Sequence, residues 1–187
     1  MTDDRQLVRN CLKGQAAAQK ELYERFAGLM MGICYRYTKS VTDAEDVLQD
    51  GFVKVFRQLH SFRFDGELGA WIRRIMVNTA INYLKKHSGY RAELSFDAHD
   101  NLHPVSEEDA ELKLTAKELA ELIRQLPTGY QTIFNLHAVE GFTHVEIGQM
   151  LGISDGTSRS QYARARQLLL SWMEKNEMTK NKLYAGK

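Results

Sequence analysis

The stretch at residues 143–170 is THVEIGQMLGISDGTSRSQYARARQLLL, and it carries the clearest local signals in this chain of 187 residues. Thr143, followed three residues later by Glu146, is the capping box that begins a helix. Gly152 then predicts a turn, and Ser154 is placed to cap a long basic helix. A short helix, a glycine turn and a second helix form a helix-turn-helix motif.

The second helix of such a motif enters the major groove of DNA, so its outward positions should hold short polar or cationic side chains. The positions predicted to face outward are Arg159, Ser160, Gln161, Arg164 and Arg166. An ordinary amphipathic helix with one solvated face is the alternative, and the turn that precedes the helix argues against it.

Helical periodicity also covers the chain upstream of this motif. Apolar residues from Leu22 to Tyr37 predict one long helix over residues 16–37. Thr42 and Glu45 predict a capping box that begins the next helix. The inward face of that helix should hold Leu48, Phe52, Val55, Leu59 and Phe62, which leaves Asp43, Asp46, Gln49 and Asp50 outside.

A third helix is expected over residues 68–87, with Trp71, Ile75 and Leu84 buried. Its other face is cationic and rich in asparagine. The polar residues predicted there are Arg73, Arg74, Asn78, Asn82 and Lys85.

The charge of the chain is unevenly placed, although its formal net charge is only +1. Residues 71–91 carry arginine and lysine without any acid, whereas residues 93–121 are mostly acidic. Apolar periodicity fades between residues 88 and 111, and only two prolines interrupt the whole chain. We therefore predict an all-α protein with domains at residues 1–88 and 112–175, a flexible acidic linker at 89–111 and a polar tail at 176–187.

Several function classes are not favoured by the sequence. Cys11 and Cys34 stand far apart without a CxxC pair, and His137 and His144 are too far apart for one helix turn, so no metal site or cofactor is predicted. No catalytic residues are predicted either. The polar start and the short apolar runs predict a cytoplasmic protein that does not insert into a membrane.

Two long segments resemble the extracytoplasmic-function (ECF) sigma factors of bacterial RNA polymerase. LPTGYQTIFNLHAVEGFTHVEIGQMLGISDGTSRSQYARARQLL, residues 126–169, is similar to their promoter-binding domain. DAEDVLQDGFVKVFRQLHSF, residues 43–62, resembles their polymerase-binding helix, and FRFDGELGAWIRRIMVNTAINYLKK, residues 62–86, resembles their promoter-melting segment. The chain departs from the family pattern at Arg73, Gly148, Ser158 and Gln161, which leaves the promoter sequence open.

The resemblance implies a sigma factor that directs core polymerase to promoters, performs no bond chemistry and traps one separated strand. Contacts with the minus-thirty-five element would come from Arg159, Ser160, Gln161, Ala163, Arg164 and Arg166. Contacts with the minus-ten element would come from Phe62, Phe64, Arg74, Asn78, Asn82, Lys85 and Lys86. Of these, Phe62 and Asn78 would form, with the loop from Phe64 to Leu68, a pocket for a base flipped out of the duplex. For Phe62, core packing alone is an equally supported interpretation.

The same resemblance implies three partners: the clamp helices of the polymerase large subunit, promoter DNA and an anti-sigma factor. Asp46, Gln49 and Asp50 would bind the clamp helices. The protein is expected to be a monomer when it is not bound to polymerase. The alternative function is a two-domain regulator that binds DNA without activating polymerase, and it leaves the cationic face of residues 68–87 unexplained.

Overall fold

The computed structural model describes residues 3–87 and 115–185, and in this part of the chain every regular element is a helix. The chain divides into two compact units, residues 1–88 and 89–187. The linker predicted at residues 89–111 lies outside the described residues. The residues predicted as a polar tail continue the last helix as far as Ala185.

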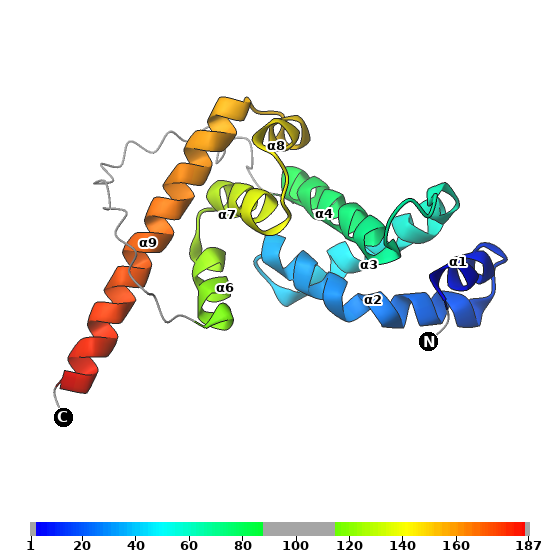
Figure 1. The fold of residues 1–187 in the computed structure, drawn as a ribbon, viewed down its shortest axis with the longest axis horizontal. Coiled ribbons are helices and arrows are strands. Elements are labelled where there is room, and N and C mark those ends of the chain that lie inside the picture. The colour runs from blue at the N-terminus through cyan, green and yellow to red at the C-terminus, as the bar shows by residue number, and fades with distance from the viewer. Residues whose placement is uncertain (1–2, 88–114, 186–187) are drawn as a thin grey trace. The chain divides into compact units, whose positions relative to one another are not determined.

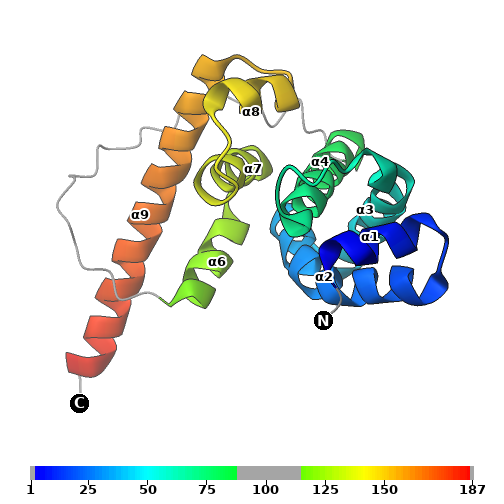
Figure 2. The same ribbon diagram turned by 45° about the vertical axis from the view of Figure 1, so that its right-hand side comes forward.

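The first unit consists of helices that pack around one core (Figures 1 and 2). They are α1 (Asp4–Leu12), α2 (Ala16–Tyr37), α3 (Val41–Gln58), the short 3-10 helix η1 (Leu59–Ser61) and α4 (Leu68–His87). Helices α2, α3 and α4 each contact the other two, and α1 lies against α2 and η1. The bounds predicted for α2 and α4 are confirmed.

The start of α3 differs from the prediction. Ser40, rather than Thr42, is the N-cap: its hydroxyl accepts a hydrogen bond from the Asp43 backbone amide at 3.0 Å. Ser40 has extended backbone angles, whereas Thr42 is already helical. Both residues carry a hydroxyl that can cap a helix, and the turn after α2 selects the first of them.

The predicted inward face of α3 is confirmed, since Leu48, Phe52 and Val55 are buried. The buried face of α4 matches the prediction only in part. Leu84 is buried as predicted, but Trp71 and Ile75 are only half-buried, whereas Ile72 and Met76 are fully buried. Contact with both α2 and α3 shifts the inward face by one residue and leaves Trp71 at its edge.

The second unit consists of α6 (Ala116–Gln125), α7 (Thr128–Phe134), the π-helical turn η2 (Asn135–Val139), α8 (His144–Leu151) and α9 (Asp155–Ala185). Its apolar core joins α6 and α7 to the middle of α9. The buried residues of this cluster are Leu122, Ile123, Leu126, Tyr130, Ala165 and Leu169. Trp172 packs against the same cluster and is partly buried.

Both cysteines lie in the core of the first unit. Cys34 is fully buried and Cys11 is 5% exposed. Burial raises the pKa of the Cys34 thiol to about 12, and it also raises the pKa of Cys11. Both side chains therefore pack as small apolar groups. None of the helices described is long and apolar enough to cross a membrane.

Candidate nucleic-acid interfaces

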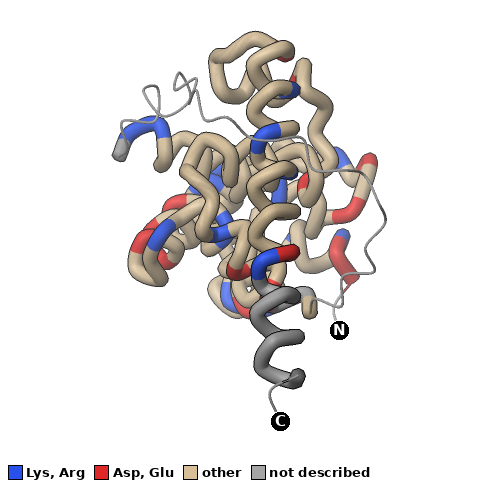
Figure 3. The backbone as a smooth tube through the Cα atoms, turned by 90° about the vertical axis from the view of Figure 1, so that its left-hand side faces the viewer, with Lys and Arg blue, Asp and Glu red and all other residues tan. Residues whose placement is uncertain are grey.

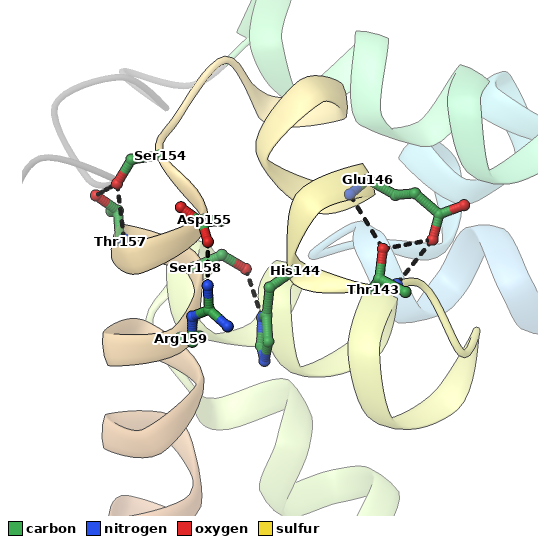
Figure 4. Close-up of polar contacts among 8 residues, drawn as sticks. All are labelled: Thr143, His144, Glu146, Ser154, Asp155, Thr157, Ser158 and Arg159. Atoms are coloured by element: carbon green, nitrogen blue, oxygen red, sulfur yellow. Dashed lines mark hydrogen bonds and ion pairs between the residues drawn. The ribbon is translucent and has the colours of Figure 1, made fainter.

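The helix-turn-helix predicted from residues 143–170 is confirmed (Figure 4). The Thr143 hydroxyl accepts from the Glu146 amide, while the Glu146 carboxylate accepts from the Thr143 amide at 2.8 Å. Gly152 ends α8 in the left-handed conformation, with φ of 73°. Ser154 then accepts a hydrogen bond from the Thr157 amide at 2.9 Å, which caps α9.

Gly148 allows the turn of this motif to close tightly on α8. A Cβ atom at this position would lie 2.8 Å from the Ile153 carbonyl oxygen and 3.5 Å from the Asp155 amide nitrogen. The Gly148 carbonyl itself accepts from the amides of Gly152 and Ile153. The turn backbone therefore packs directly on the α8 backbone, and an alanine here would require the two to separate.

The exposed face of α9 carries most of the predicted DNA-contacting residues. Arg159, Ser160, Ala163 and Arg166 are exposed, and Arg164 is half-buried. Gln161 is the exception, because it is only 3% exposed. Its predicted outward orientation is wrong, since it lies at helical spacing between the fully buried Ser158 and Ala165.

Arg159 forms an ion pair with Asp155 one turn earlier on α9 (Figure 4). The two side chains are 62% and 45% exposed. Exposed pairs of this kind contribute little to stability. The guanidinium can therefore exchange this carboxylate for a phosphate or a base edge at low cost.

A cluster of rings links η2, α8 and α9. The rings of His137 and His144 stack with centroids 4.2 Å apart, and Tyr162 contacts His137 edge-on at 4.6 Å. His144 Nδ1 also lies 2.9 Å from the hydroxyl of Ser158. Burial lowers the pKa of His144, and the nearby charges of His137 and Arg159 lower it further. The two histidines that the sequence separates thus meet across the turn at Gly141.

A pocket of about 380 Å³ opens in the first unit, where the loop after η1 meets the start of α4. Its lining residues are Ser61, Phe62, Arg63, Asp65, Gly66, Glu67, Ala70, Trp71 and Arg74. Phe62 contacts Trp71 with ring centroids 5.5 Å apart and is only 9% exposed. Phe62 therefore packs on the core and lines the pocket at once. Trp71, which was predicted to lie in the core, forms part of the wall.

Asn78 does not line this pocket and lies instead on the exposed face of α4. The residues with solvent-facing side chains on that face are Arg74, Asn78, Asn82, Lys85 and Lys86. Figure 3 marks the lysines and arginines along the backbone. The spacings of these five residues place them along one side of the helix, which extends from the pocket toward the end of the first unit.

Phe64 is held in an unusual backbone conformation in the pocket loop. Its φ is 60°, which is the left-handed region that non-glycine side chains rarely adopt and which costs about 1–3 kcal/mol. Its ring contacts the Phe62 ring, with centroids 4.8 Å apart. The guanidinium carbon of Arg5, on α1, lies over the Phe64 ring at 5.4 Å from its centroid. No role for α1 was predicted from the sequence.

The acidic face of α3 is confirmed for Asp46, Gln49 and Asp50, which are all exposed. Asp43 is half-buried instead, and its carboxylate accepts a 2.6 Å hydrogen bond from the Tyr83 hydroxyl on α4. This hydrogen bond is the main reason that the pKa of Tyr83 rises to about 12. Asp43 therefore joins α3 to α4, and the three exposed residues remain available for a partner.

The described residues contain no group of three or more histidine, cysteine or acidic side chains placed to hold a metal ion. The exposed faces of α4 and α9 carry arginines, lysines, asparagines and a serine, and the pocket is lined by aromatic rings together with Asp65 and Glu67. Cations, amides, hydroxyls and rings bind phosphates and bases by charge, hydrogen bonding and stacking.

Two family models match the chain. Sigma-70 region 2 matches residues 22–90, which contain the pocket, the cationic face and the acidic face. Sigma-70, region 4 matches residues 116–169, which contain the helix-turn-helix.

Curated relatives match over most of their length. The chain is 31% identical to the ECF RNA polymerase sigma-E factor of Haemophilus influenzae over 178 residues, which are 89% of this chain and 93% of the relative. It is also 31% identical to the ECF RNA polymerase sigma-E factor of Escherichia coli, with 89% and 92% covered. For the ECF RNA polymerase sigma factor SigW of Bacillus subtilis the identity is 26%, with 87% and 92% covered.

Two solved structures share the fold. CnrH, in complex with the cytosolic domain of CnrY, matches with a TM-score of 0.50 and 24% identity, covering 91% of this chain and 97% of CnrH. The sigma factor RpoE of Bartonella quintana, crystallised with the anti-sigma factor NepR, matches with a TM-score of 0.51 and 20% identity, covering 83% and 96%.

Proposed function

This chain belongs to the ECF RNA polymerase sigma factors of the sigma-70 family, and from that membership we propose which residues carry out each step of initiation. As a sigma factor it directs RNA polymerase to promoters. This membership favours a sigma factor over the alternative function, a regulator that binds DNA without activating polymerase. The residue assignments rest on one observation. The chain contains both a helix-turn-helix, in the second unit, and an aromatic pocket beside a cationic helix face, in the first unit.

The second unit binds the minus-thirty-five element through the exposed face of α9. Arg159 and Arg164 bind phosphates or guanine edges, and Ser160 with Ala163 lies close to the bases. Arg166 binds the backbone. Gln161 faces the interior of the unit and is not among the proposed DNA contacts.

The first unit traps the separated strand of the minus-ten element. An unstacked base enters the pocket, where Phe62 and Trp71 offer ring faces and Arg74 stands at the rim. The next phosphates follow the exposed face of α4. The residues assigned to that path are Asn78, Asn82, Lys85 and Lys86.

Asp46, Gln49 and Asp50 bind the clamp helices of the polymerase large subunit through their exposed position on α3. This role requires only binding to polymerase and DNA, so we propose a cytoplasmic protein that uses no catalytic residues and no cofactor. An anti-sigma factor is proposed as a further partner, because both neighbouring structures contain a second chain, which in the RpoE structure is named an anti-sigma factor. The protein is expected to be a monomer when unbound.

Run-off transcription with purified core polymerase on genomic fragments tests this assignment, with start sites mapped by sequencing. Discrete starts should appear only when the protein is added. Asp50→Arg should abolish them by weakening core binding, whereas Glu24→Arg, the same charge change on the exposed face of α2, should preserve them.

Arg164→Ala should weaken initiation through the minus-thirty-five element and preserve core binding. Lys175→Ala, further along α9, is its matched control and should have little effect. Starts that persist in the Asp50→Arg and Arg164→Ala variants would refute these two residue assignments.

A further inference from the structure

The loop between Phe62 and Leu68 forms one wall of the pocket, and its shape depends on Phe64. With φ at 60°, Phe64 occupies a backbone region that favours glycine. A side chain keeps such a backbone only where its neighbours hold it in place. The contacts of the Phe64 ring are therefore contacts that maintain the loop.

Two contacts hold that ring. The Phe62 ring lies 4.8 Å away between centroids, and the Arg5 guanidinium lies over the Phe64 ring at 5.4 Å. The second distance is within the range at which a cation is attracted to an aromatic face. Phe62 lines the pocket, so the contacts connect Arg5 to the pocket wall through Phe64.

Arg5 is presented from a helix that is itself firmly anchored. Leu7 and Val8 of α1 are 0% and 1% exposed. Asp4, next to Arg5, forms an ion pair with Arg25 of α2 at 2.7 Å. Helix α1 also contacts η1, which directly precedes the loop. These contacts hold α1, and with it Arg5, in place beside the loop.

We propose that Arg5 is a positioning residue for base selection at the minus-ten element. Through Phe64 it holds the loop against Phe62 and so fixes the shape of the pocket that receives an unpaired base. Arg5 does not line the pocket itself, so its effect on the base is indirect. This inference rests on the function proposed above for the first unit.

The test uses the full chain bound to core polymerase and a promoter from the run-off map, with the non-template strand randomised across the melted segment. Bound DNA is recovered and sequenced. Arg5→Gln should reduce discrimination among bases at the pocket position about two- to fivefold, as expected for loss of one exposed cation–π contact. Arg5→Lys, which keeps the cation, should retain part of the discrimination.

Arg9→Gln is the matched control, because it removes the same charge from an exposed position on the same helix. It should leave base discrimination unchanged. Phe64→Leu should also reduce discrimination, and adding Arg5→Gln to it should cause no further loss, because both changes break one contact chain.

The inference is overturned if Arg5→Gln matches the wild type in base frequencies, or if Arg9→Gln loses as much. It is also overturned if Arg5→Gln loses thermal stability or core binding in step with selectivity, since that result indicates general support of the fold. A wild-type holoenzyme without base preference in the randomised segment would overturn the proposed pocket function as well. A selective wild type with an equally selective Arg5→Gln overturns this inference alone.

Discussion

The imidazole rings of His137 and His144 stack with their centroids 4.2 Å apart, and they join the middle of η2 to the first residue of α8. Ser158 and Arg159 approach the same cluster from α9. A proton on His144 would place a cation against a second histidine and beside an arginine. The helix-turn-helix thus has a titratable group, His144, where α8 contacts α9.

Acidification should destabilise the second unit. Burial, with His137 and Arg159, lowers the pKa of His144 below its ordinary value of 6.5, and Asp155 acts weakly in the opposite direction. The unfolded chain then binds more protons, so this contribution to stability is present above about pH 6.5 and is lost as pH falls through the lowered pKa. Urea denaturation followed by Trp172 fluorescence in a Trp71→Phe background measures it at pH 7.5 and 5.5.

His144→Asn is the control for this pH dependence, because asparagine retains a polar partner for Ser158 and does not titrate. The decline in unfolding free energy between the two pH values should be smaller in the variant. An equal decline in both proteins would show that other groups are responsible.

Gly148→Ala should destabilise the helix-turn-helix and weaken binding to the minus-thirty-five element. The added methyl would gain about 1 kcal/mol of helix propensity, but contact with the Ile153 carbonyl at 2.8 Å forces the turn away from α8 at a cost of about 1–3 kcal/mol. Thermal unfolding measures the balance. Gly156→Ala is the matched control, since its nearest neighbour is the Ser154 hydroxyl at an ordinary 3.6 Å, and it should be neutral or stabilising.

Tyr83→Phe should lower the unfolding free energy of the first unit by about 1 kcal/mol, because the hydrogen bond to the Asp43 carboxylate is lost. Trp71 fluorescence in a Trp172→Phe background reports on this unit. Tyr23→Phe removes a hydroxyl from a ring that contacts Phe52 at a tilted angle and is 40% exposed, so it should have little effect. Equal losses in the two variants would argue against a specific role for the Tyr83–Asp43 contact.

Gln161→Leu should change the stability of the second unit without changing which minus-thirty-five sequence is preferred. The side chain is 3% exposed and faces the interior of the unit. Selection of bound sequences from a randomised element, compared between the wild type and the variant, measures preference. A new preference confined to one base position would instead indicate that Gln161 reaches the DNA.

The local signals of the sequence predicted much of this fold. The capping box at Thr143, the turn at Gly152 and the cap at Ser154 depend on residues within a few positions of one another, and all three are confirmed. The face of α4 was predicted less well. Both α2 and α3 pack against it, and a helix with two neighbours has a wide buried surface that periodicity alone does not orient.

The pocket and the histidine cluster could be predicted only in part, for a similar reason. The resemblance implies a role for Phe62, but the place of Trp71 in the pocket wall and the contact of Arg5 with Phe64 depend on how the helices of the first unit pack together. His137 and His144 lie seven positions apart with a glycine turn between them, so helical spacing gave no sign that their rings meet. Gln161 is buried although polar residues are mostly exposed, so its polarity alone does not predict which way it faces.

The two buried thiols make this protein well suited to site-specific labelling. With Cys34 enclosed and its pKa near 12, and with Cys11 almost as well covered, maleimide reagents should react slowly with the folded native chain. A cysteine introduced at Ser160 would then be the fastest-reacting thiol of the folded protein. A fluorophore attached there would report the arrival of DNA at α9 in real time, without removal of either native cysteine from the core.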